Sequence, residues 1–133
     1  MPLKRINPQG LATPETYTQV IVATGSRLVF VAGQVAEDGE GNLVGPGDLA
    51  AQARQAFANV GRALAGAGAQ PDQVAKITIF VVALRPEHLP AIEAGRVALF
   101  EEHKPVDALI GVKSLAHPGC LIEIEAIAVL DDT

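Results

Sequence analysis

The stretch that decides the fold is Leu121-Ile122-Glu123-Ile124-Glu125-Ala126-Ile127. Apolar and acidic residues alternate along it, and a β-strand sends successive side chains to opposite faces of its sheet. One face is aliphatic and is expected to pack on helices: Ile122, Ile124 and Ala126. The other face carries Glu123 and Glu125, with Ile127 beside them. These carboxylates either face solvent or lie at a junction between subunits, where burial raises the pKa of a carboxyl group and suits it to activate water.

Strands and two helices are predicted around this segment. Runs rich in aliphatic and β-branched residues predict strands at 20–23, 28–32, 74–83, 107–112 and 121–130. Helical spacing of apolar residues predicts a helix from Leu49 to Leu64, capped by Asp48, and a second helix over Glu87–Glu102. The first two strands are expected to form a hairpin through Thr24-Gly25-Ser26. The order ββ-α-β-α-ββ indicates an α/β (α+β) fold, a mixed sheet with both helices on one face.

Size and composition indicate one domain, residues 1–133. An apolar share of 49% against 19% charged residues argues against disorder, and the uncovered sheet face predicts self-association. The net charge of −5 argues against nucleic-acid binding. The longest apolar-rich run, Ile77–Leu84, is too short to span a membrane. A single cysteine fits a reducing compartment, so a cytoplasmic location is expected.

Several familiar motifs have ordinary structural interpretations. The glycines in 61–68 follow a helix, whereas a phosphate-binding loop precedes one. Cys120, which follows Pro118-Gly119, is interpreted as a small buried hydrophobe rather than a nucleophile. The histidines lack metal-ligand spacing and are expected to be solvated or locally capped: His88, His103 and His117. We therefore expect no metal.

The sequence resembles the Rid family, also called the YjgF family, along nearly its whole length. The matching residues are Gly33-Gln34, Gln52, Asn59, Leu64, Val74–Val81, Pro105, Gly111-Val112, Leu115 and Ile122–Val129. The resemblance implies a chorismate-mutase-like fold, a homotrimer, and clefts between neighbouring subunits that bind a small molecule. It also implies hydrolysis of imines or enamines without a cofactor, as in members that convert 2-iminoacids to 2-ketoacids and ammonia.

The resemblance also implies site residues. Glu123 matches the glutamate that positions the attacking water, and Tyr17 matches a pocket tyrosine near the N-terminus. Gly33 keeps the backbone position of the Gly-Gln turn, and Glu93 stands where an asparagine is often found. With Glu123 as the catalytic group, the expected ligand-binding set is Tyr17, Gly33, Glu93, Asp107, Leu109 and Cys120.

One position departs from the family pattern. The substrate carboxylate is held by an arginine in a Pro-x-Arg motif, but this chain has Pro105-Val106-Asp107. Like charges about 4 Å apart cost roughly 4 kcal/mol at an effective dielectric near 20, which is about three decades of affinity. Deamination of 2-iminoacids is therefore not expected. If Glu93, Asp107 and Glu123 meet, their cleft favours a cationic or hydrogen-bond-donating ligand, unless Arg96 restores the positive charge.

Three hypotheses for function remain open. The first is hydrolysis of a C=N bond in a small metabolite without a carboxylate, with backbone N–H groups near Gly33 and Leu109 holding the developing charge. The second is a non-catalytic binding or regulatory trimer that uses the same clefts. The third is a ribonuclease, against which the acidic charge balance, the scarcity of aromatic residues and the lack of a histidine pair all argue.

Overall fold

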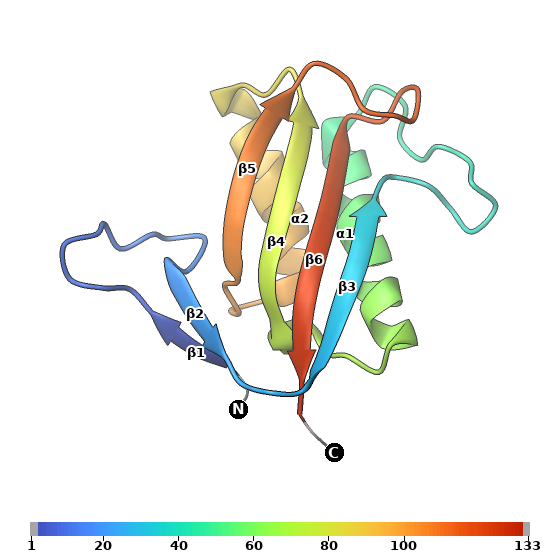
Figure 1. Ribbon diagram of the computed structural model, residues 1–133. Coiled ribbons are helices and arrows are strands. Elements are labelled where there is room, and N and C mark those ends of the chain that lie inside the picture. The colour runs from blue at the N-terminus through green and yellow to red at the C-terminus, as the bar shows by residue number, and fades with distance from the viewer. Residues whose placement is uncertain (1–2, 132–133) are drawn as a thin grey trace.

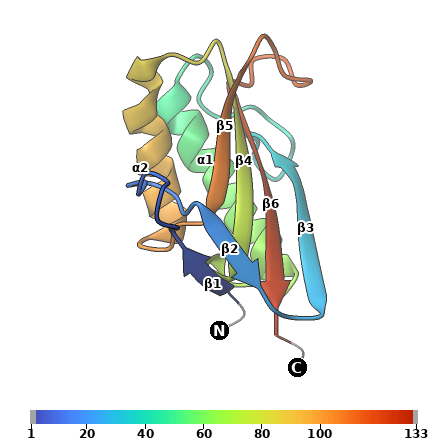
Figure 2. The same cartoon turned by 60° about the vertical axis from the view of Figure 1, so that its left-hand side comes forward.

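The computed structural model describes residues 3–131 as a four-stranded sheet with two helices packed on one face (Figure 1). The strand order is β3 (Arg27–Gln34), β6 (Ile122–Leu130), β4 (Val74–Val82) and β5 (Val106–Val112). The β4–β5 pair is parallel and the other two pairs are antiparallel, so the sheet is mixed. Figure 2 shows α1 (Leu49–Gly66) and α2 (Leu89–Phe100) on the same side of it. The predicted fold class is confirmed.

A small second sheet lies beside the first. It pairs β1 (Leu3–Ile6) with β2 (Val20–Ala23) in antiparallel fashion. The predicted hairpin between β2 and the next strand is wrong, because β3 pairs with β6 instead. At Gly25 the chain runs against the end of β6, so closely that a Cβ atom there would collide with the Leu130 carbonyl. The segment between β2 and β3 therefore leads the chain from the small sheet to the main sheet. Strand β1 was not predicted from the sequence.

The predicted alternation along β6 is confirmed. Ile122, Ile124 and Ala126 are buried, whereas Glu125 is exposed and Glu123 is half-buried. On β4 the neighbours of Glu125 and Glu123 are Thr78 and Phe80, so all four side chains lie on the face away from the helices. The apolar run over 74–83 predicts a central strand that is buried on both faces. For a single chain this prediction is wrong, because Lys76 is exposed on the face away from the helices. Helices cover only one face of the sheet.

The core lies between the helices and the sheet. The five apolar residues whose spacing predicts helix α1 are all buried: Ala53, Ala56, Phe57, Val60 and Leu64. Phe57 packs edge-to-face on Phe100 of α2, with 6.3 Å between ring centroids. The apolar spacing of Leu89, Ile92, Leu99 and Phe100 predicts that all four face inward from α2. This prediction is wrong for Leu89, which is exposed at the first position of α2, after a 3₁₀ turn over Pro86–His88. No helix within residues 3–131 is long and apolar enough to cross a membrane.

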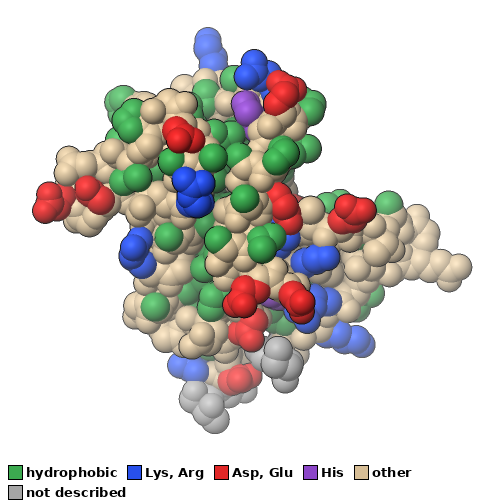
Figure 3. Space-filling model, turned by 180° about the vertical axis from the view of Figure 1, so that it is seen from behind, with side chains coloured by type: hydrophobic (Ala, Val, Ile, Leu, Met, Phe, Trp, Pro, Cys, Tyr) green, Lys and Arg blue, Asp and Glu red, His purple; other side chains and the backbone are tan. Residues whose placement is uncertain are grey.

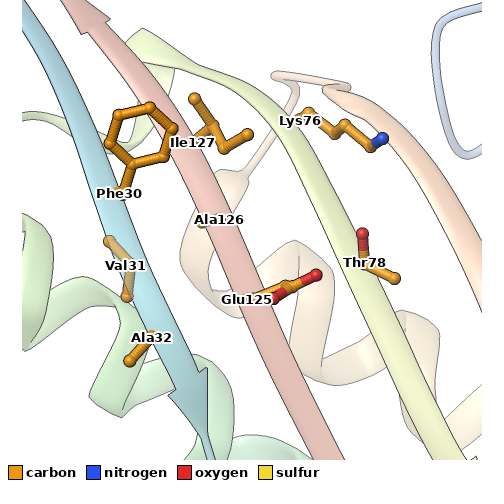
Figure 4. A pocket seen from close by; sticks show the side chains of 8 residues that line it. All are labelled: Phe30, Val31, Ala32, Lys76, Thr78, Glu125, Ala126 and Ile127. Carbon is orange, nitrogen blue, oxygen red and sulfur yellow. The ribbon is translucent and has the colours of Figure 1, made fainter.

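The outer surface of the helix layer is mixed in character. Figure 3 views this side and shows acidic and basic side chains on it together with hydrophobic ones. The opposite side is more apolar, since Phe30 is 71% exposed there, and Leu28 and Ile110 are also exposed. Figure 4 shows Phe30 beside Ile127, its partner in the β3–β6 register, with Glu125 and Thr78 nearby. They line a hollow of about 430 Å³ on the uncovered face.

A buried glutamine joins helix α1 to the loops at one end of the sheet. The Gln52 side chain is fully buried, and its Nε2 donates to the carbonyls of Gly45 (3.1 Å) and Gly119 (3.0 Å). Its Oε1 accepts from the N–H of Leu121 at 2.8 Å. Buried polar groups need such partners. One side chain therefore fixes the start of α1, the turn after β5 and the entry to β6.

Replacing Gln52 by Leu should lower the free energy of unfolding by at least about 2 kcal/mol, because one unsatisfied buried polar group costs about 1–3 kcal/mol. Urea unfolding followed by circular dichroism measures the change. Gln9→Leu makes the same chemical change at an exposed position and should shift stability by less than about 0.5 kcal/mol. Equal stabilities for the two variants would contradict the role given to Gln52.

Candidate functional site

The candidate site residues lie on two different faces of the sheet. Asp107 is in register with Ile77 of β4, whose side chain is buried under the helices. Glu123 is in register with Phe80, on the uncovered face. Residues in register on neighbouring strands point to the same side of a sheet. Asp107 and Glu123 of one chain therefore face opposite ways, and the predicted three-carboxylate cluster does not form within a single chain.

The candidate residues on the helix-covered face of the sheet surround a pocket of about 210 Å³ at the β5 edge. Strand β5 contributes Asp107 and Leu109, helix α2 contributes Glu93 and Arg96, and the segment before β2 contributes Tyr17. The remaining lining residues are mostly aliphatic: Thr16, Ile79, Leu89 and Ile92. Four predicted ligand-binding residues thus lie together here. The neighbours that sequence reasoning did not assign come from α2, β4 and the N-terminal segment.

Arg96 enters this pocket, but its charge is already paired. The side chain is 3% exposed, and its Nε donates to Oε2 of Glu93 at 2.8 Å, while Nη2 donates to Oε1. The third contact runs from Nη1 to the carbonyl of His103 at 3.3 Å. The i,i+3 spacing of Glu93 and Arg96 is the sequence signal for this pair. None of these hydrogen bonds reaches Asp107 or Glu123.

Asp107 is the unusual group of the pocket. Burial raises the pKa of this carboxyl group to about 6, with Arg96 nearby lowering the pKa and Glu93 raising it. Within residues 3–131, no group donates a hydrogen bond to its oxygens. A half-buried carboxylate that accepts no hydrogen bond from the protein is stabilised by a ligand that donates one. The pocket therefore suits a small ligand with an N–H group or a positive charge.

Gly33 and Glu123 are the candidate residues on the uncovered face. Gly33 falls in the stretch of β3 where pairing with β6 is irregular, between Val31 and Gln34. A Cβ atom at residue 33 would collide with the Glu123 carboxylate and would come within 2.9 Å of its Cγ. The Glu123 carboxylate thus lies directly over the Gly33 backbone, and a side chain at residue 33 would have to displace it.

Cys120 precedes β6 and is 5% exposed. Burial raises the pKa of its thiol, and the nearby carboxylates of Glu37 and Glu123 raise it further. A thiol with a raised pKa is a poor nucleophile, as expected for a buried hydrophobe.

The histidines have three different environments. His88 accepts from the N–H of Arg85 at 3.1 Å, which is the predicted local capping, and His117 lies 3.4 Å from Glu37. The same expectation is wrong for His103, which is buried and bonded to distant parts of the chain. Among residues 3–131, no group of three or more His, Cys, Asp or Glu side chains could hold a metal ion.

Comparisons with known proteins agree with this fold. A family model described as endoribonuclease L-PSP matches residues 8–130. The 2-iminobutanoate/2-iminopropanoate deaminase of Rattus norvegicus is 31% identical over 113 residues, covering 85% of this chain and 79% of the rat protein. A RutC family protein of Synechocystis is 33% identical over 116 residues, covering 86% and 85%.

Solved structures give the same result. A Yersinia pestis protein of unknown function from the conserved Rid family superimposes with a TM-score of 0.91 at 39% identity, covering 98% of this chain and 100% of the other. The YjgF gene product of E. coli has a TM-score of 0.67 at 32% identity, covering 78% and 81%. The chain therefore belongs to the Rid (YjgF-like) family, whose model carries the endoribonuclease L-PSP description.

Proposed function

We propose that this protein hydrolyses the C=N bond of a small imine or enamine that lacks a carboxylate, in clefts shared by neighbouring copies of a homotrimer. Membership of a family with named imine deaminases supports the reaction type. The choice of substrate rests on one observation, the donor-free Asp107 carboxyl in its pocket. A carboxylate-bearing substrate would be repelled there, whereas a protonated imine or amine would supply the missing donor.

The opposite directions of Asp107 and Glu123 favour a site built from two copies. Within one chain the sheet separates the two carboxyl groups, so both cannot contact one small substrate. Strand β5 is an edge strand, and the uncovered face carries exposed apolar side chains such as Phe30. Exposed apolar patches of this kind mark contact surfaces. Packing the β5 edge of one copy against the uncovered face of the next brings the two groups to one cleft.

The reaction needs one water and no cofactor. Glu123 accepts a proton from the water, whose oxygen forms a bond to the imine carbon as the C=N π electrons move to nitrogen. Glu123 passes this proton to the nitrogen, which gives a tetrahedral carbinolamine. Glu123 then moves the hydroxyl proton to the nitrogen in the same way, the C–N bond breaks as the C=O bond forms, and a carbonyl compound and ammonia or an amine leave. Backbone N–H groups near Gly33 and Leu109 stabilise the developing charge. Asp107 holds the nitrogen end of the substrate through a charge-assisted hydrogen bond.

A second function, binding without turnover, is favoured by one specific observation. Arg96 is tied to Glu93 and His103, so it does not replace the arginine that imine deaminases of this family use for a substrate carboxylate. A trimer that only binds amines at the same clefts would fit this pocket equally well. The ribonuclease description of the family model has less support from this chain, whose net charge of −5 disfavours contact with phosphates.

Glu123→Gln is expected to reduce turnover by about 10²–10⁴-fold, the usual contribution of general acid–base catalysis, while ligand affinity changes little. Ammonia release from imines generated from a panel of amine precursors measures turnover. Glu125→Gln is the matched control, because Glu125 lies two residues along the same strand and the same face. If the wild type hydrolyses none of the imines yet binds amines, the hydrolase proposal fails and the binding trimer is supported. Cleavage of RNA that survives rigorous purification would instead favour the ribonuclease.

Binding of a small primary amine that stays protonated from about pH 5 to pH 8 should strengthen as pH rises through about 6, where Asp107 becomes ionised. Below that pKa, affinity should fall by up to tenfold per pH unit, because the carboxyl must lose its proton to hold the cation. Asp107→Asn should bind the amine more weakly and lose this dependence. Calorimetric titration from about pH 5 to pH 8 compares the two proteins. Tight binding of a simple 2-ketoacid to the wild type would contradict the proposal.

A further inference from the structure

Within residues 3–131, the hydrogen bonds between the N-terminal hairpin, residues 3–23, and the main sheet and helices all end on one short segment. Three hydrogen bonds end on the connection between α2 and β5, which is His103-Lys104-Pro105. The Thr18 N–H donates to the Pro105 carbonyl at 3.2 Å, and the Thr18 hydroxyl donates to the Lys104 carbonyl. The third bond joins Nη1 of Arg5 to Nδ1 of His103 at 2.8 Å. This hairpin carries Tyr17 to the pocket of Asp107.

The two partners of His103 fix its protonation state. Its Nε2 lies 2.7 Å from the Val74 carbonyl, and a carbonyl can only accept, so Nε2 carries a hydrogen. Its Nδ1 faces Arg5, and a guanidinium can only donate, so Nδ1 carries none. The ring is therefore the neutral Nε2–H tautomer. A second proton on Nδ1 would remove the acceptor for Arg5 and place two positive groups in contact.

We propose that His103 is a positioning residue whose neutral form holds the N-terminal hairpin, and with it Tyr17, against the Asp107 pocket, and whose protonation releases them. This inference goes beyond the proposed function and does not depend on it, because docking of the hairpin can be measured without any ligand. Release changes the Asp107 pocket through Tyr17 and not through contact between His103 and substrate.

The surroundings of His103 give the direction of the pH effect. Burial is the largest cause that lowers its pKa below the usual 6.5; Arg5 on β1 and Arg96 on α2 lower it further. The bond to the Val74 carbonyl and the charge of Asp72, in the turn before β4, act in the opposite sense. Because His103 has a higher pKa when the hairpin is released than when it is docked, protonation of His103 favours release of the hairpin. Docking is complete above about pH 6.5 and weakens as pH falls below it.

Amide hydrogen exchange of residues 3–6 and 20–23 tests the proposal, with the core strands β4 and β6 as internal reference. The protection of the wild-type hairpin against exchange should fall between about pH 7.5 and about pH 5.5. The fall should be at most tenfold for each pH unit by which the pKa of His103 is lower in the docked hairpin than in the released one. His103→Gln should keep the protection and lose its pH dependence. A glutamine amide accepts from Arg5 and donates to Val74 without titrating in this range.

Two further variants separate the effect of His103 from the effects of its charged neighbours. Asp107→Asn removes a nearby carboxyl group whose pKa is about 6 and should keep the wild-type pH dependence of the hairpin. Arg5→Met removes the partner and leaves His103, so protection should be low already at about pH 7.5 and should change less with pH. Because Tyr17 is the only tyrosine and the chain has no tryptophan, quenching of intrinsic fluorescence reports the same release. Wild-type protection that does not change with pH, or an unchanged pH dependence in His103→Gln, would overturn the proposal.

Discussion

Along β6, side chains two residues apart face the same way, and this period divides the molecule into two unlike sides. On one side Ile122 and Ile124 pack beneath α1 and α2 and complete the core. On the other side Glu123 lies over the backbone of Gly33, on a surface that no helix covers. Shifting β6 by one residue would exchange the two sides, burying carboxylates under helices and exposing isoleucines. The core and the candidate chemistry thus depend on one strand register.

The sequence predicted those parts of the fold that are written in a short local pattern. The alternation in β6 and the helical spacing in α1, with Asp48 as its N-cap, lie within single segments, and the structure confirms them. Strand partners are a non-local choice. The segment Thr24-Gly25-Ser26 has the composition of a hairpin turn, yet it passes the end of β6 and leads into another sheet. Nothing within five or six residues of it specifies that difference.

The candidate site shows the same limit. Resemblance supplied Tyr17, Glu93, Asp107 and Leu109, and the structure brings these four to one pocket. That Asp107 faces the helices could not be predicted, because it follows from the register of β5 on β4. The i,i+3 spacing in the sequence indicates the Glu93–Arg96 ion pair, but it does not show that the pair faces the pocket of Asp107. The environment of His103 was missed since its partners, Arg5 and Val74, lie in other parts of the sequence.

The contact between Gly33 and the Glu123 carboxylate links two positions that are far apart in the chain. While the glutamate is present, any side chain at residue 33 must push it out of place. If a descendant of this protein lost the need for that carboxylate, a shorter residue at 123 would open space over β3, and residue 33 would be free to vary for the first time. The glycine would then persist only by inheritance. Its replacement in a relative would therefore point to the loss of the carboxylate that lies over this strand here.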